Sequence, residues 1–89
     1  MIKKEVKILN ELGLHARAAA KVVKLANEFS SKIELKKDSQ IANAKSIISL
    51  LILFAGKGQT LELMIDGADE EAACQAIINL FEKKFYEEQ

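Results

Sequence analysis

The residue of this 89-residue sequence best suited to chemistry is its one histidine, His15. It follows Gly13 and Leu14 at the expected start of a helix, where free backbone amides and the positive end of the helix dipole lie close to the ring. A neutral imidazole is a nucleophile, and amides at a helix start stabilise an attached anion. Arg17 can donate paired hydrogen bonds to phosphate oxygens. The residues alone leave two interpretations: a nucleophile that carries an anion, or a loop histidine without a chemical role.

The distribution of charge supports an anion-facing surface in the first half of the chain. Lys21 and Lys24 extend the positive field of Arg17, with no acidic residue between positions 15 and 27. Residues 1–50 carry 10 basic and 5 acidic side chains, whereas residues 51–89 carry 3 and 8. Because the total charge is zero, a dedicated nucleic-acid binder is not expected. We expect the first half to meet anionic partners.

Ser46 and the apolar run after it allow two interpretations each. Ser46 can be the N-cap of a short helix or a phosphorylation site, where the added charge beside Lys45 would change docking. The run from Ile47 to Phe54 fits a buried strand or a short helix, and the N-cap favours the helix. A short helix cannot bury so many apolar residues, so some would form an exposed partner surface.

Other candidate sites are absent from the sequence. Cys74 and Met64 are expected to serve packing rather than chemistry, since no neighbouring residues have metal-ligand spacing. Gly56-Lys57-Gly58 lacks the spacing of a nucleotide-binding loop and is expected to be a turn. We therefore expect no metal and no cofactor. A lone cysteine, the lack of a signal-peptide pattern and the lack of a membrane-length apolar run favour a cytoplasmic protein without membrane insertion.

Periodicity predicts one α+β domain over residues 1–89. Apolar alternation predicts four strands, at residues 2–9, 32–36, around Ile41 and 60–66. Apolar residues spaced three and four apart predict a helix over residues 16–29 and a last helix from about residue 69 to 85. With the short helix after Ser46, the order is β-α-β-β-α-β-α. A ferredoxin-like fold with an extra helix fits the same order.

The sequence resembles the histidine-containing phosphocarrier (HPr) family of the bacterial phosphoenolpyruvate:sugar phosphotransferase system. Three motifs occur in the order and spacing of that family, in a chain of similar length: Gly13-Leu14-His15-Ala16-Arg17, Ala44-Lys45-Ser46-Ile47 and Asp66-Gly67-Ala68-Asp69-Glu70. The resemblance implies an open-faced β-sandwich, in which three helices cover one face of a four-stranded antiparallel sheet.

The resemblance also implies a function in sugar transport. His15 would accept a phosphoryl group on Nδ1 from phosphorylated enzyme I and pass it to an enzyme IIA domain, while Arg17 steadies the group. Ser46 matches a regulatory serine that HPr kinase/phosphorylase modifies, and a transcriptional regulator is a further implied partner. Docking would use the residues Lys21, Lys24, Lys45, Ile47, Ile48 and Leu51. The protein would be a monomeric, stoichiometric phosphoryl carrier rather than an enzyme with turnover of its own.

Two positions depart from the family pattern. Ala18 replaces a usual proline that presets the first helical turn, and Ala is compatible with that turn. Phe54 replaces a common glycine at the exit of the short helix, which disfavours Phe if the backbone there has a positive φ. Two other functions stay open: a family carrier in a regulatory or nitrogen-related phosphorelay, and a small ligand-binding or interaction module without phosphotransfer.

Overall fold

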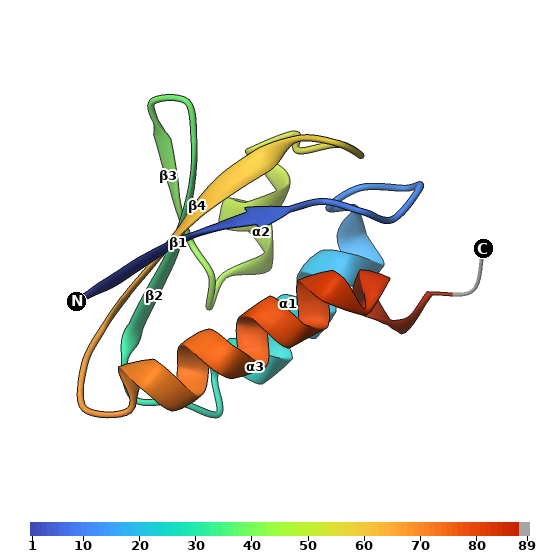
Figure 1. Ribbon diagram of the computed structural model, residues 1–89. Coiled ribbons are helices and arrows are strands. Elements are labelled where there is room, and N and C mark those ends of the chain that lie inside the picture. The colour runs from blue at the N-terminus through green and yellow to red at the C-terminus, as the bar shows by residue number, and fades with distance from the viewer. Residues whose placement is uncertain (88–89) are drawn as a thin grey trace.

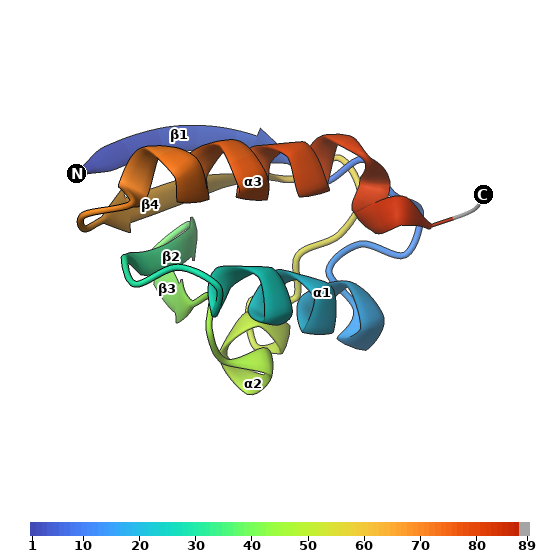
Figure 2. The ribbon, with the colours of Figure 1, turned by 90° about the horizontal axis from the view of Figure 1, so that it is seen from below.

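The computed structural model describes residues 1–87 and confirms the predicted element order. Its elements run in the order β1 (Ile2–Lys7), α1 (Ala16–Ala26), β2 (Lys32–Lys37), β3 (Gln40–Asn43), α2 (Ile47–Leu51), β4 (Thr60–Asp66), α3 (Glu70–Glu82) and a 3₁₀ turn, η1 (Lys84–Tyr86). The three helices lie on one side of the sheet and leave its other face open (Figures 1 and 2). The open-faced β-sandwich is therefore confirmed.

The four strands form one antiparallel sheet in the order β1-β4-β2-β3. Strand β4 lies between β1 and β2 and pairs with both, for example through Glu62 opposite Glu5 and Leu63 opposite Leu35. Strands β1 and β2 are thus parallel to each other, joined by α1, and β3 and β4 are related in the same way through α2. Two β-α-β units interleave in the sheet. The edge position of β1 excludes the ferredoxin-like alternative, in which the first strand is internal.

The core lies between the sheet and the helices, as the alternation predicted. The strand residues that face the helices are buried: Val6, Ile33, Leu35, Leu61, Leu63 and Ile65. Helix α1 covers them with Ala19, Val22 and Ala26, and α3 with Ala73, Ile77, Leu80 and Phe81. Burying such side chains stabilises the fold by about 1.5 to 3 kcal/mol each. The helix faces predicted from the spacing are therefore the ones that pack.

Both long helices end earlier than predicted. Helix α1 stops at Ala26, because the amides of Glu28 and Phe29 bond to carbonyls only three residues back. Helix α3 stops at Glu82, and Lys84, Phe85 and Tyr86 all have φ between 54° and 57°. This left-handed turn still buries Phe85, whose ring meets Phe81 edge-on at 4.9 Å between centroids. The apolar residues spaced three and four apart therefore continue to Phe85, beyond the end of α3 at Glu82.

The ambiguous apolar run is a short helix, with Ser46 as its N-cap. The hydroxyl of Ser46 accepts a hydrogen bond from the amide of Ser49 at 3.3 Å. Leu50 and Leu53 enter the core, whereas Ile47, Ile48 and neighbouring apolar residues remain exposed. The predicted exposed apolar surface is thus present. Within residues 1–87, no helix combines the length and apolar character required to span a membrane.

One carboxylate ties the turn after α1 to the start of α3. Asp69 accepts hydrogen bonds from the amides of Ser30 (2.9 Å) and Ser31 (3.0 Å) and from the Ser31 hydroxyl. Gly67 packs so close to this turn that a Cβ atom would lie 2.5 Å from Ser31 Oγ. The hydrogen bond from the Ser31 hydroxyl, followed by that from the Ser30 amide, lowers the pKa of Asp69 to about 2.

We expect Asp69 to make stability depend on pH between about 4 and 2. Because its pKa is lowered on folding, its contribution is present above its ordinary pKa of 3.8 and is lost as the pH falls towards 2. Asp69→Asn should therefore be less stable than the wild type in urea unfolding at pH 7, with the difference shrinking at pH 2. Asp38→Asn, on the exposed β2–β3 turn, is the control. An equal difference at both pH values would contradict the prediction.

Candidate functional site

His15 is the N-cap of α1, so one residue both ends the preceding loop and begins the helix. Its backbone is extended, and its Nδ1 accepts a hydrogen bond from the amide of Arg17 at 3.3 Å. The loop is held against the segment after α2, because the amide of Leu14 donates to Ala55 O at 2.9 Å. Gly13 has φ 67°, and a Cβ atom there would lie 2.7 Å from Ala55 O. Glycine is therefore required two residues before the histidine.

The other ring nitrogen of His15 contacts the carboxylate of Glu87. Nε2 forms a short hydrogen bond with Glu87 Oε2, across 72 positions of sequence. The His15 side chain is 26% exposed, whereas that of Glu87 is only 6% exposed. Because Nδ1 accepts and Nε2 faces a carboxylate, the proton of a neutral ring belongs on Nε2. The free lone pair is then on Nδ1, at the start of the helix.

A buried asparagine fixes the carboxylate. Asn10 donates to Glu87 Oε1 at 2.9 Å and to Gly13 O at 2.8 Å. Burial alone would raise the pKa of the Glu87 carboxyl, but the hydrogen bonds from His15 and Asn10 outweigh burial and hold that pKa below its ordinary range. Glu87 is thus a carboxylate at neutral pH. A carboxylate on Nε2 can stabilise the positive charge that an imidazole acquires when Nδ1 forms a new bond.

Glu87 reaches the site through the left-handed turn that follows α3. The turn buries Phe85, and the ammonium of Lys21 on α1 bonds to Phe85 O. Sequence reasoning missed Glu87, because no glycine marks this turn and an acidic chain end resembles an ordinary solvated segment. The one available signal was Phe85, whose place in the apolar stripe predicted that the chain remains packed beyond Glu82.

The predicted basic residues of α1 do not all point to His15. Arg17 and Lys24 are exposed, whereas the ammonium of Lys21 donates a hydrogen bond to Phe85 O.

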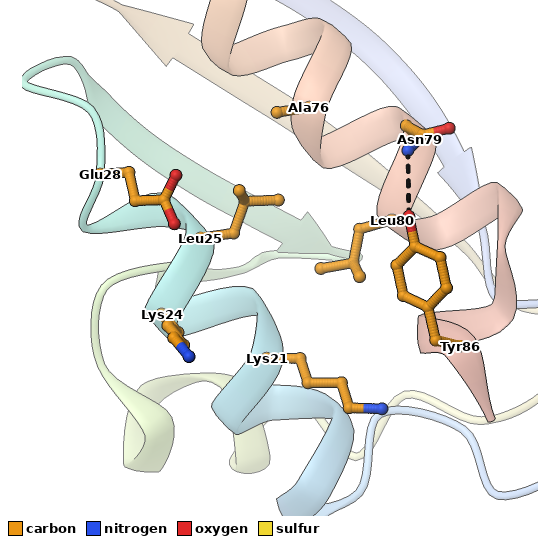
Figure 3. A pocket seen from close by; sticks show the side chains of 8 residues that line it. All are labelled: Lys21, Lys24, Leu25, Glu28, Ala76, Asn79, Leu80 and Tyr86. Atoms are coloured by element: carbon orange, nitrogen blue, oxygen red, sulfur yellow. Dashed lines mark hydrogen bonds between the residues drawn. The ribbon is translucent and has the colours of Figure 1, made fainter.

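A groove of about 420 Å³ lies between α1 and α3. It is lined by Lys21, Lys24, Asn79 and Tyr86, among others (Figure 3). Asn79 donates to the Tyr86 hydroxyl at 3.3 Å across one end of it. The groove does not include Arg17, which is the predicted cation closest in sequence to His15 and is exposed to solvent.

The remaining predicted residues, which were assigned to regulation and docking, lie on and just before α2. Helix α2 packs against α1. Ile47 and Ile48 are exposed, as a docking surface requires, but Leu51 is half-buried against the core. Lys45 is half-buried, and its ammonium donates to Phe29 O at 2.8 Å. Ser46 is half-buried as the N-cap. The docking role of these residues stays a prediction, and Lys45 also ties α2 to the end of α1.

The two departures from the family pattern have different structural consequences. Ala18 is fully buried in the first turn of α1, which forms without a proline. Phe54 has φ 50°, the left-handed conformation for which glycine is favoured. The backbone conformation at this position therefore disfavours a bulky side chain such as that of Phe54, as expected for a positive φ.

The sequence and the structure are similar to known phosphocarrier proteins. The family model described as "PTS HPr component phosphorylation site" matches residues 2–83. The phosphocarrier protein HPr of Treponema pallidum is 49% identical over 88 residues, covering 99% of this chain and all of the relative. The phosphocarrier protein NPr of Shewanella violacea is 43% identical over 86 residues, covering 97% of this chain and 94% of the relative. The crystal structure of HPr-C-His from Thermoanaerobacter tengcongensis superposes with a TM-score of 0.95 at 43% identity, covering both chains fully.

We expect the Glu87 carboxylate to slow the exchange of the His15 Nε2 proton. A hydrogen bond to a charged group contributes about 1.5 to 3 kcal/mol, so Glu87→Ala should accelerate exchange of this proton by at least about tenfold. Proton NMR at neutral pH would measure the rate. Glu82→Ala, which removes an exposed carboxylate at the end of α3, should leave the rate unchanged. Equal rates in wild type and Glu87→Ala would argue against the contact.

Proposed function

The chain belongs to the HPr family, and from this premise we propose that it carries phosphoryl groups on His15 Nδ1 in the phosphoenolpyruvate:sugar phosphotransferase system. Phosphorylated enzyme I is the proposed donor, and an enzyme IIA domain is the proposed acceptor. The observation that carries the proposal is the hydrogen bonding of the ring, which leaves the lone pair of Nδ1 at the start of α1. The predicted docking residues Lys21, Lys24, Lys45, Ile47, Ile48 and Leu51 belong to the same proposal.

The proposed step is a direct displacement at phosphorus. A bond forms between His15 Nδ1 and phosphorus while the bond from phosphorus to the donor breaks, and the reverse exchange delivers the group to the acceptor. The Arg17 amide donates to Nδ1 only at 3.3 Å, so a weak hydrogen bond is given up when the nitrogen reacts. Arg17 and the helix amides face the added negative charge, and Glu87 faces the ring. The site is partly exposed, which suits a group that must be handed between proteins.

A second carrier function has specific support. The NPr relative is 43% identical to the chain, close to the identity of many HPr relatives. A regulatory or nitrogen-related phosphorelay is therefore the alternative, and it would use the same His15 chemistry with a different donor. Parallel assays with the donor protein of each system would distinguish them.

Regulation at Ser46 is also part of the proposal. A phosphate on Ser46 would sit at the start of α2, beside the exposed Ile47 and Ile48. It would add about −1.5 to −2 charges to a surface that otherwise favours acidic partners. HPr kinase/phosphorylase is the proposed modifying enzyme, and a transcriptional regulator is a proposed partner of the phosphorylated form.

We expect phosphoenolpyruvate and a catalytic amount of enzyme I to add one phosphoryl group to the wild type and none to His15→Ala. Intact mass measured at neutral or alkaline pH preserves the acid-labile adduct. His15→Ala should remain folded, since losing an N-cap costs about 1 kcal/mol. His15→Asn keeps a capping side chain without the nucleophile and is the matched control. An adduct on either variant would contradict the assignment, and a wild type without an adduct would favour another donor or a module without phosphotransfer.

We expect Ser46→Asp to lower kcat/KM for phosphorylation by enzyme I by about tenfold, which corresponds to roughly 1.4 kcal/mol. The reason is repulsion between the new carboxylate and an acidic docking surface. Ser39→Asp adds the same charge on the exposed turn between β2 and β3 and should have little effect. Equal kinetics for Ser46→Asp, and for protein phosphorylated at Ser46, would remove the regulatory part of the proposal.

A further inference from the structure

Phe54 is an aromatic residue that contributes little to the folded core. Phe54 is 84% exposed, more than any other large apolar residue that the structure describes. Its φ of 50° places it in the left-handed region, where a bulky side chain is rare because its Cβ crowds the backbone. Because its ring is exposed and its backbone is strained, Phe54 is not a residue that stabilises the fold. An exposed, strained residue points to a role outside the fold.

The backbone that carries Phe54 is held in place from two sides. The ammonium of Lys37 donates to Leu53 O and to Phe54 O, each at 2.9 Å. The next residue, Ala55, accepts the hydrogen bond from Leu14, which directly precedes His15. The ring is therefore presented from a fixed backbone, one residue from the segment that positions the nucleophile.

Phe54 lies among other exposed apolar side chains. The exposed residues of α2 and of the two segments beside His15 are Leu12, Ile47, Ile48, Ile52 and Phe54. Gly13, next to Leu12, packs directly against Ala55 and Gly56. Leu12 and Phe54 therefore belong to two segments that contact each other directly before His15, although other exposed apolar residues, such as Ile41 and Tyr86, lie elsewhere. Exposed apolar residues beside a reactive side chain are typical of a partner interface.

The segments that carry these residues are basic, and the acids beside them are paired: Glu11 contacts Lys57, and Glu87 contacts His15. Residues 12–27 and 39–61 contain no Asp or Glu, and their exposed cations include Arg17 and Lys24. These two segments supply His15, α1, β3 and α2. A partner that covers this surface is complementary when it offers an apolar recess with carboxylates at its rim.

We propose that Phe54 is the aromatic anchor with which the chain docks on its phosphoryl donor, inserting the ring into an apolar recess that acidic side chains surround. This inference rests on the proposed phosphocarrier function and adds a residue that determines recognition. Aromatic side chains held rigidly at the centre of an interface contribute most strongly to binding. The strained backbone at Phe54 is accepted in the free protein because the ring is buried only in the complex.

The test is phosphorylation by enzyme I at varied concentrations of the chain, for wild type, Phe54→Gly, Phe54→Tyr and Ile41→Ala. Phe54→Gly removes the ring and suits the positive φ, so its thermal unfolding midpoint should equal or exceed that of the wild type. Its KM should rise at least about tenfold with kcat within about twofold, because docking is lost and the chemistry is not. Phe54→Tyr keeps the ring and should retain the wild-type KM. Ile41→Ala removes an exposed apolar side chain from the open face of the sheet and should change neither constant.

Each outcome either supports or overturns the inference. An unchanged KM for Phe54→Gly, with the wild type phosphorylated normally, would overturn the anchor and leave the carrier function intact. An equal rise in KM for Ile41→Ala would also overturn it, because any exposed apolar residue would then suffice. A wild type that enzyme I does not phosphorylate would instead reject the proposed function. A fall in the unfolding midpoint of Phe54→Gly would show that the ring stabilises the fold, contrary to the inference.

Discussion

The site is organised by one contact between the start of α1 and the segment after α3, the hydrogen bond between His15 and Glu87. The carboxylate determines which ring nitrogen holds the proton, and therefore which nitrogen is free at the start of α1. Asn10 aligns the carboxylate with the loop, and Lys21 holds the turn from which it extends. The nucleophile is thus defined by residues of the first loop, of α1 and of the segment after α3, although only His15 performs the proposed chemistry.

Sequence reasoning predicted the framework well because the framework depends on local periodicity. The alternation of Leu61, Leu63 and Ile65 and the apolar stripes of the helices specify which faces are buried, and burial governs the layers. The position of His15 was also predictable, since a helix start is a local feature. Glu87 was not predictable, because its contact needs a left-handed turn that no glycine signals. For Lys45 the prediction of docking described only part of its role, since a long side chain can also reach a distant carbonyl.

The surface around His15 combines features that work against folding with features that suit exchange between proteins. Ile48 and Phe54 expose apolar area, and Phe54 also carries backbone strain. Only a small core opposes these costs, and it is stabilised by tight packing of the sheet against α1 and α3. The proposed carrier function accounts for the arrangement, because a phosphoryl group can be exchanged quickly only when its surroundings are open to successive partners.

The edge position of β1 also has a consequence for how the chain acquires its structure during synthesis. Residues 2–7 pair only with β4, from Thr60 to Asp66, so this strand has no sheet partner until residues 60–66 have been translated. Contacts this distant in sequence slow folding, because a long loop must close before they form. The apolar side chains of β1, Ile2 and Val6, therefore stay without their sheet neighbours until β4 has been made. Glu87 is translated later still, so that His15 acquires its hydrogen-bonding partner only after the sheet can close.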